Sequence, residues 1–202
     1  MVENGCDLGI VADPLRIPHD DDRWEGDTLG SGGYCSRTRC RCPSPRFARP
    51  EEGICSGGLG AHHGGGGVPP PRLSVWEYGG RLDDLAACLR GPTVVAGDFN
   101  AHSPMCGSPR TNSNGRLVET WAAAEVLRIL NQGSGNTFVG HRSGFSIVDL
   151  TWASPAALRK VSEWRMLDHV ETGSDYLYVW FRVILTRDGT VPPPITALLR
   201  RL

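Results

Sequence analysis

The alternation of hydrophobic and polar positions predicts a chain in which strands and helices follow one another. β-Branched and aliphatic residues cluster in short runs that are typical of buried strands. These runs cover residues 7–12, 93–95, 137–139, 145–152, 164–167 and 177–185. Apolar residues at helical spacing predict helices over 82–89 and 117–130, and a shorter helix over 154–161. We therefore expect an α/β domain whose last residues, 195–202, form one or two helical turns.

Residues 31–67 do not follow this pattern. The segment contains ten glycines but only two large aliphatic residues, Ile54 and Leu59. Because so little of it can bury an apolar face, we expect it to be disordered. Its cysteines and histidines leave a zinc site open as an alternative, although paired Cys-x-x-Cys spacing is missing. Its arginines leave open a loose contact with nucleic-acid phosphates.

Length and charge narrow the classes of protein further. The chain of 202 residues is long enough for one domain with a substantial core. Its formal net charge of −1 gives no global attraction to nucleic acid, so binding of that kind must rest on a local patch. The sequence has no apolar run of the ~18 residues that a membrane span needs, and its first residues lack the features of a signal peptide. We expect an intracellular protein that binds no membrane.

Acidic residues stand at or within several of the predicted strands. Asp98 and Asn100 follow one strand, Asp175 precedes the last one, and Asp13 follows the first. Asp149 lies inside an apolar strand, where its charge requires a cleft or a partner. Carboxylates gathered at one sheet edge suit a Mg²⁺-assisted phosphodiesterase, because the metal neutralises charge at the scissile phosphate and a carboxylate activates water. Taken singly, Asp98 also fits an Asx turn and Asp175 a capped loop.

Several separated motifs occur in a fixed order along the chain. They are Gly97-Asp98-Phe99-Asn100-Ala101-His102-Ser103, Gly107-Ser108-Pro109-Arg110-Thr111, Gly115-Arg116, Leu130-Asn131, Ser146-Ile147-Val148-Asp149-Leu150-Thr151-Trp152-Ala153-Ser154 and Ser174-Asp175. Together they resemble the endonuclease/exonuclease/phosphatase superfamily, and in particular the apurinic-endonuclease-like domain of site-specific non-LTR retrotransposons. The resemblance runs through residues 68–185 and returns at 7–30.

This resemblance implies a four-layer α/β sandwich, in which two packed mixed β-sheets are flanked by helices. It also implies that the strand with which the family begins is missing ahead of Met1. The implied activity is a Mg²⁺-dependent nick in one strand of DNA that leaves a 3′-hydroxyl, with Mn²⁺ as a substitute metal. In the retrotransposons that end primes a reverse transcriptase domain further along the polyprotein, which this chain does not include. A DNA substrate implies the nucleus.

The resemblance also assigns roles to residues by their position in the motifs. Asp98 would orient and deprotonate the attacking water, and Asn100 would hold that water and a phosphate oxygen. Asp149 would position this constellation. Asp175 would stand behind the final catalytic residue. Asp13 occupies the place of a metal-binding Glu, so Asp13 and Asp175 are the expected metal ligands.

Tyr176 departs from the family, which has a histidine on the scissile phosphate at this position. Tyrosine is neutral near pH 7, and loss of such a group typically costs ~10²–10⁴-fold in rate. We therefore expect a single domain over residues 1–185, with an aberrant insert at 31–67 and a tail at 186–202, whose activity is impaired or absent. A catalytically dead retroelement relic, or a zinc- or nucleic-acid-binding module built on the Arg/Cys-rich segment, are the alternatives.

Overall fold

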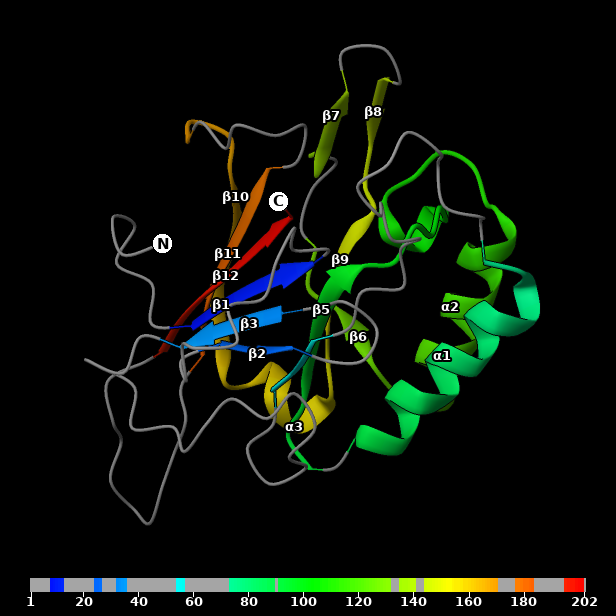
Figure 1. Cartoon of the computed structure of the whole chain (residues 1–202), viewed down its shortest axis with the longest axis horizontal. Helices are drawn as coiled ribbons and strands as arrows, with labels where there is room; N and C mark the ends of the chain where they lie inside the picture. Colours follow the sequence, from blue (N-terminus) through cyan, green and yellow to red (C-terminus); the bar gives the residue numbers. More distant parts are fainter. Residues whose placement is uncertain are drawn as a thin grey trace.

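The computed structural model describes residues 8–12, 24–26, 32–35, 54–56, 73–89, 91–131, 135–140, 144–170, 177–183 and 195–201. Within these ranges the chain forms two packed β-sheets with helices against one of them (Figure 1). Asp13, Asp175 and Tyr176 lie outside the described residues.

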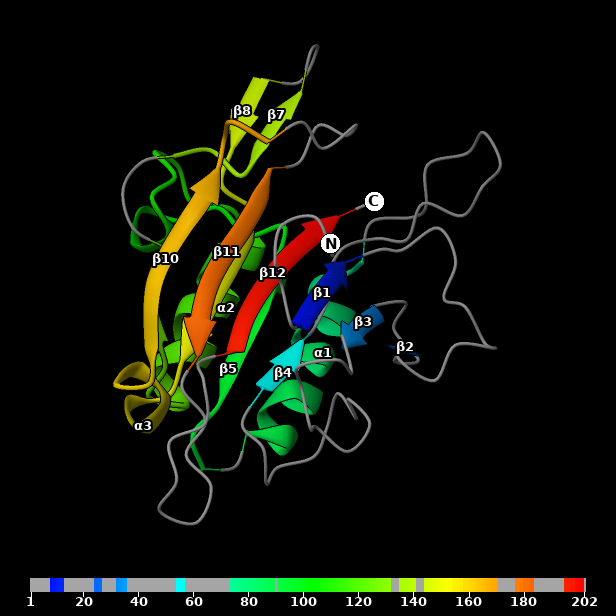
Figure 2. The same cartoon turned by 90° about the vertical axis from the view of Figure 1, so that its left-hand side faces the viewer.

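We name the first sheet the large sheet. Its described strands are β1 (Leu8–Ala12), β2 (Trp24–Gly26), β3 (Gly32–Cys35), β10 (Val161–Leu167), β11 (Tyr178–Val183) and β12 (Ile195–Arg201). They lie in the order β10-β11-β12-β1-β3-β2, side by side in Figure 2. β12 runs parallel to β1 and antiparallel to β11, so the sheet is mixed.

The small sheet consists, in the described part of the chain, of β4 (Ile54–Ser56), β5 (Val94–Asp98), β6 (Arg128–Ile129) and β9 (Asp149–Ala153). Its order is β4-β5-β9-β6, and it is also mixed, because β4 is parallel and β9 antiparallel to β5. A separate hairpin joins β7 (Phe138–Gly140) to β8 (Gly144–Ser146) and stands above both sheets in Figure 1.

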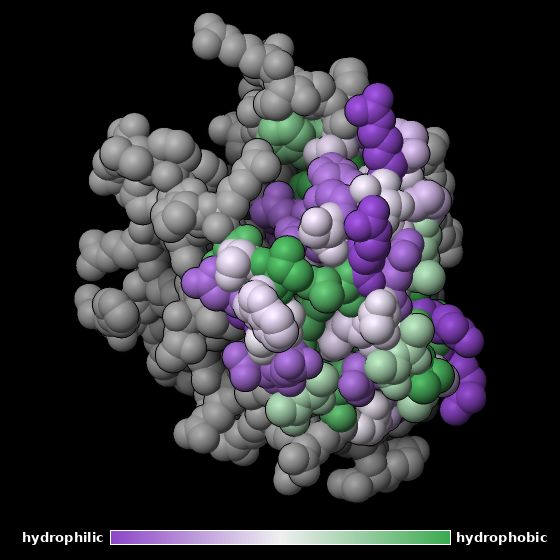
Figure 3. All heavy atoms as spheres, turned by 90° about the vertical axis from the view of Figure 1, so that its right-hand side faces the viewer, coloured by the Kyte–Doolittle hydropathy of each residue, from purple (hydrophilic) through white to green (hydrophobic). Residues whose placement is uncertain are grey.

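Helices α1 (Val75–Cys88) and α2 (Ser113–Ala124) pack on the outer face of the small sheet, as Figure 1 shows on its right-hand side. Their solvent-facing surface is mixed, with hydrophilic side chains around a hydrophobic area (Figure 3). Two shorter helical segments, η2 (Pro104–Cys106) and α3 (Pro155–Leu158), follow β5 and β9. None of the helices in the described ranges is long and apolar enough to cross a membrane.

The strand β5 separates two hydrophobic cores, because successive side chains of a strand point to opposite faces. Val95 faces the helices and joins a core that contains Trp121 and Trp152. Its neighbours Val94 and Ala96 face the large sheet, in a core shared with β11. The α/β fold with two packed mixed sheets and flanking helices is thus confirmed.

Three local expectations from the sequence are wrong. The helix expected over 117–130 is α2, which begins at Ser113 and ends at Ala124, because the chain turns at Val126 into a left-handed conformation with φ of 57°. The strand expected over 145–152 is broken between β8 and β9. The segment expected to form helical turns is β12, whose hydrogen bonds with β11 and β1 outweigh the marginal stability of so short a helix.

Residues 31–67, which we expected to be disordered, contain two strands that the structure describes. β3 pairs with β1 and β2 in the large sheet, and β4 pairs with β5 in the small sheet. The other residues of that segment lie outside the described part of the chain.

Candidate active site

Two aspartates lie opposite each other where β5 ends and β9 begins. Asp98 and Asp149 are register partners in the antiparallel ladder, and each is nearly inaccessible, with 1% and 3% of its surface exposed. Directly opposed residues of such a ladder have Cβ atoms roughly 4.5–5.5 Å apart on one face. Asp98 lies an even number of residues after Val94 and Ala96, so its side chain points to the same face of β5 as theirs. That face is turned to the large sheet. Both residues were singled out from the sequence, and the strand register of the fold brings them opposite each other.

Asn100 is joined to Asp98 by hydrogen bonds within a turn. It follows the end of β5, and its backbone has a φ of 45°. The backbone N–H of Asn100 donates to Asp98 Oδ1 at 2.8 Å, and its Nδ2 donates to Oδ2 at 3.3 Å. This is an Asx turn. The turn that we gave as the structural explanation of Asp98 is therefore also the arrangement that places Asp98 and Asn100 together for a catalytic role.

The start of α2 holds this turn from the other side. Asn112 is the N-cap residue, and its Oδ1 accepts from Gly115 N at 2.7 Å and from His102 N at 3.0 Å. Asn112 and Asn114 both donate through Nδ2 to the carbonyl oxygen of Asn100, at 3.2 and 3.3 Å. A Cβ on Gly115 would lie 1.9 Å from the carbonyl oxygen of His102, so this close approach requires glycine.

Asp149 is fixed by two polar side chains to which the sequence analysis gave no role. The hydroxyl of Thr137, which is fully buried, accepts from the backbone N–H groups of Val148 at 3.0 Å and Asp149 at 3.1 Å. Asn131 donates to the carbonyl of Asp149 at 2.9 Å and accepts from Thr151 N at 2.8 Å. These two side chains therefore fix the backbone at the start of β9.

Thr137 also links this strand to the segment before β11. Its carbonyl accepts from Leu177 N at 2.8 Å. The residue that directly follows Asp175 and Tyr176 in sequence is thus hydrogen-bonded to the residue that fixes the start of β9, while Asp175 and Tyr176 themselves lie outside the described residues.

Tyr78, on α1, supports the site from beneath. It is fully buried, and its hydroxyl donates to the carbonyl of Phe99 at 2.6 Å. Burial raises the pKa of Tyr78 above its ordinary value of 10, and the negative charge of Asp98 raises it further. Tyr78 consequently stays protonated and keeps donating to the backbone between Asp98 and Asn100.

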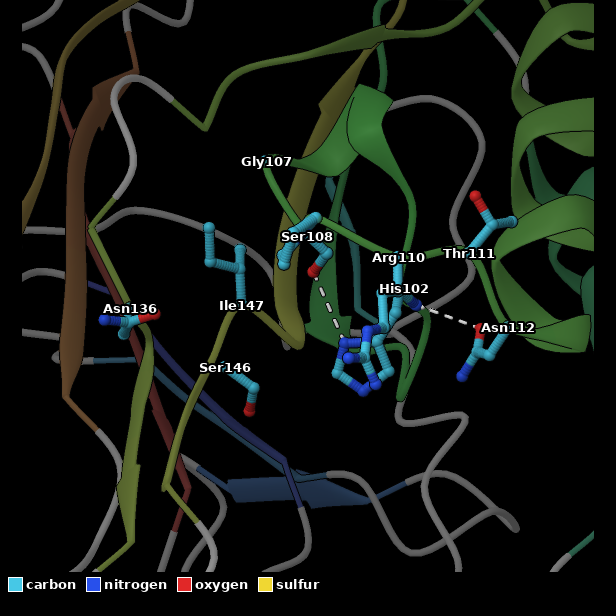
Figure 4. Close-up of a pocket in the computed structure, with 10 residues that line it drawn as sticks. His102, Gly107, Ser108, Arg110, Thr111, Asn112, Asn136, Ser146 and Ile147 are labelled. Carbon is cyan, nitrogen blue, oxygen red and sulfur yellow. Dashed lines mark hydrogen bonds between the residues drawn. The ribbon is translucent and has the colours of Figure 1, made fainter.

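A polar pocket of about 410 Å³ lies next to this turn. It is lined by His102, Gly107, Ser108, Pro109, Arg110, Thr111, Asn112, Asn136, Ser146 and Ile147. Figure 4 shows His102, Arg110 and Asn112 on one side of it, with Asn136 and Ser146 on the other. His102 Nδ1 lies 3.3 Å from the hydroxyl oxygen of Ser108, which fixes the ring at the pocket wall. The cationic and amide side chains suit an anionic or nucleotide ligand.

The site contains oxygen ligands of the kind that bind divalent metal ions. The part of the chain that the structure describes contains no group of three or more His, Cys, Asp or Glu side chains able to bind a metal. Asp98, Asp149 and Asn100 nevertheless supply carboxylate and amide oxygens at one sheet edge. Mg²⁺ is usually held by one or two carboxylates, with water and substrate phosphates completing its shell. The donor set therefore fits such an ion, whereas the predicted ligands Asp13 and Asp175 lie outside the described residues.

Sequence reasoning missed Tyr78, Asn112, Asn114, Asn131 and Thr137. Asn112 carried a usable signal, since an asparagine directly before a helix is a preferred N-cap. Asn131 lay in a recognised motif without an assigned role. Thr137 and Tyr78 carried no local signal, because their partners are separated from them by many residues.

The chain is similar to known proteins in sequence and in fold. Residues 70–180 match a family described as endonuclease-reverse transcriptase. Among solved structures, the fold is similar to the endonuclease domain of TRAS1, a telomere-specific non-LTR retrotransposon. The TM-score is 0.63 and the identity 16%, and the alignment covers 92% of this chain and 90% of that chain. None of the curated proteins compared with the chain matches it.

Proposed function

The chain belongs to the endonuclease-reverse transcriptase family, and on that premise we propose that it is a divalent-metal-dependent DNA endonuclease domain of non-LTR retrotransposon origin. It would hydrolyse one phosphodiester bond of a DNA duplex and leave a 3′-hydroxyl end. With chromosomal DNA as the substrate, it would act in the nucleus, beside a reverse transcriptase domain of its parent protein.

The observation that carries this proposal is the opposition of Asp98 and Asp149 beside the Asn100 turn. A carboxylate within hydrogen-bond reach of water can take its proton as the water attacks phosphorus. Asp98 is the residue for that step, and it receives two hydrogen bonds from Asn100 that fix its orientation. Asn100 would hold the water and a phosphate oxygen through its amide, and Asp149 would keep the carboxylate of Asp98 in place.

A bound Mg²⁺, or Mn²⁺ in its place, would neutralise charge that develops on the scissile phosphate. Asp98, Asn100 and Asp149, which lie among the described residues, would supply oxygen ligands to the ion. Asp13 and Asp175 are the further ligands that we expect from the sequence. The polar pocket next to the turn would receive the nucleotide beside the scissile bond, with Arg110 near its phosphate.

The rate is expected to be low because Tyr176 stands in place of histidine. A neutral phenol cannot supply the positive charge of an imidazolium to the phosphate. The same substitution favours the second candidate, a retroelement relic that keeps the fold but has lost catalysis.

The experiment is a supercoiled-plasmid nicking assay on the whole chain, with Mg²⁺, with Mn²⁺ and with EDTA. We expect metal-dependent conversion to the open circle, its loss in Asp98→Ala, and a gain of about 10²-fold or more in Tyr176→His. Arg159→Ala, at the exposed C-cap position that follows α3, is the matched control that should nick like the wild type.

If the protein is folded but neither the wild type nor Tyr176→His nicks DNA, that result would favour the catalytically dead retroelement relic. Nicking that persists unchanged in EDTA or in Asp98→Ala would contradict the proposed site.

A further inference from the structure

One asparagine connects the catalytic turn to the helix that follows it. Asn112 uses both atoms of its amide group: the oxygen accepts from Gly115 and His102, and the nitrogen donates to the carbonyl of Asn100. Its backbone N–H donates to the carbonyl of His102 at 3.0 Å as well. A single half-buried side chain therefore contacts α2 and both ends of the segment from Asn100 to His102.

Asn100 depends on such support because of its backbone. A positive φ is an uncommon conformation for any residue with a side chain, even though asparagine tolerates it better than most. Asp98 accepts a hydrogen bond from the backbone N–H of Asn100 and so fixes one side of this residue. The carbonyl of Asn100 is the backbone group through which the direction of the chain after the turn can be fixed. That carbonyl receives two donors, from Asn112 and from Asn114.

We propose that Asn112 is a positioning residue, whose amide nitrogen holds Asn100, and through it Asp98, in the geometry that hydrolysis needs. This inference rests on the proposed endonuclease function for its kinetic consequence, but not for its structural one. The amide oxygen of Asn112 caps the helix, so the two halves of one side chain have separate tasks. Displacement of reacting groups by about 1 Å can cost ~10²-fold in rate.

The separation of tasks makes a clean variant available. Asn112→Asp keeps an oxygen for the Gly115 and His102 amides and is an equally good N-cap, but it places an acceptor against the Asn100 carbonyl. Asn112→Ser keeps the cap and adds no charge, yet its hydroxyl is too short to replace the donor to Asn100. Ser113→Ala, at the exposed next position, is the matched control.

We would measure nicking kinetics, the thermal unfolding midpoint and the amide hydrogen exchange of Asn100 on the whole chain. In both Asn112 variants we expect kcat to fall at least about tenfold with little change in KM. The exchange of the Asn100 N–H should become about fivefold faster, while amides within α2 keep their protection. Ser113→Ala should match the wild type in all three measurements.

Wild-type exchange at Asn100 in both variants would overturn the proposal, whatever the nicking assay gives. A fall in kcat that follows only a lower unfolding midpoint, and is recovered on cooling, would overturn it too, because a cap alone explains that result. If the wild-type chain fails to nick DNA with either Mg²⁺ or Mn²⁺, the proposed endonuclease function is wrong. The exchange measurement still decides the role of Asn112 in that case.

Discussion

Val126 has a β-branched side chain in a left-handed conformation, with φ of 57°. It occupies the position after the C-cap of α2, where a Schellman motif closes the helix: Val126 N donates to Ala123 O at 3.2 Å and Leu127 N to Ala122 O at 2.8 Å. Glycine is the usual residue there because it has no Cβ to crowd the backbone. We expect Val126→Gly to stabilise the chain by about 1 kcal/mol, measured by urea unfolding.

The side chain of Val126 contributes little that the glycine variant would lose, since 53% of its surface is exposed. Ala124→Gly is the matched control, because Ala124 is exposed in the last helical turn with ordinary helical backbone, and glycine should destabilise it by about 0.5–1 kcal/mol. Destabilisation by both substitutions would show that the strain at Val126 is not significant.

The first turn of α1 contains a capping box, which gives this helix a pH-dependent end. Glu77 accepts from the backbone N–H of Ser74 at 2.8 Å and from its hydroxyl at 2.7 Å, and these bonds lower the pKa of Glu77 below 4.5. The folded-state pKa is lower than the unfolded one, so this stabilisation is complete above the unfolded value. It is lost as the pH falls through the folded value.

We therefore expect Glu77→Gln to flatten the decline of the unfolding midpoint below about pH 4.5, as followed by circular dichroism at 222 nm. The variant and the wild type should differ most near neutral pH and converge in acid. Asp83→Asn, exposed on the same helix, serves as the control. A wild-type curve parallel to that of Glu77→Gln at all pH values would contradict the role of the box.

The same helix shows what local patterning can and cannot predict. Its apolar spacing from Leu82 onward was read correctly, but the Ser74-x-x-Glu77 signature that sets its start was overlooked. The strands β1, β5 and β11 were predicted because each contains a short run of aliphatic, β-branched or aromatic residues. The end of α2 and the identity of β12 were not, because they depend on a strained valine and on pairing partners distant in sequence.

The residues of the candidate site also differ in whether local sequence identifies them. Asp98, Asn100 and Asp149 could be found from sequence because their chemistry is carried by short motifs. The side chains of Asn112 and Thr137 act on the site through hydrogen bonds to residues 10 to 12 positions away. The pairing of Asp98 with Asp149 arises from strand register, which no spacing along the chain encodes.

The chain as a whole, with a net charge of −1, cannot attract DNA by its overall field. Affinity must then come from a few local contacts, and each phosphate contact contributes a slope of about −0.9 to the dependence of log K on log salt. Arg110 is exposed on the wall of the polar pocket, beside the proposed position of the scissile strand. We expect Arg110→Ala to weaken duplex binding and to make that slope shallower by about 1, measured by fluorescence anisotropy in EDTA.

Arg159→Ala is the matched control for this measurement, because it removes the same charge at the C-cap of α3. That helix lies at the opposite end of the small sheet from the β7–β8 hairpin in Figure 1. A global field would make the two variants equivalent, since each changes the net charge by one unit. Equal slopes for Arg110→Ala and Arg159→Ala would therefore place the DNA elsewhere on the molecule, whereas a change confined to Arg110→Ala locates it over the pocket and the opposed aspartates.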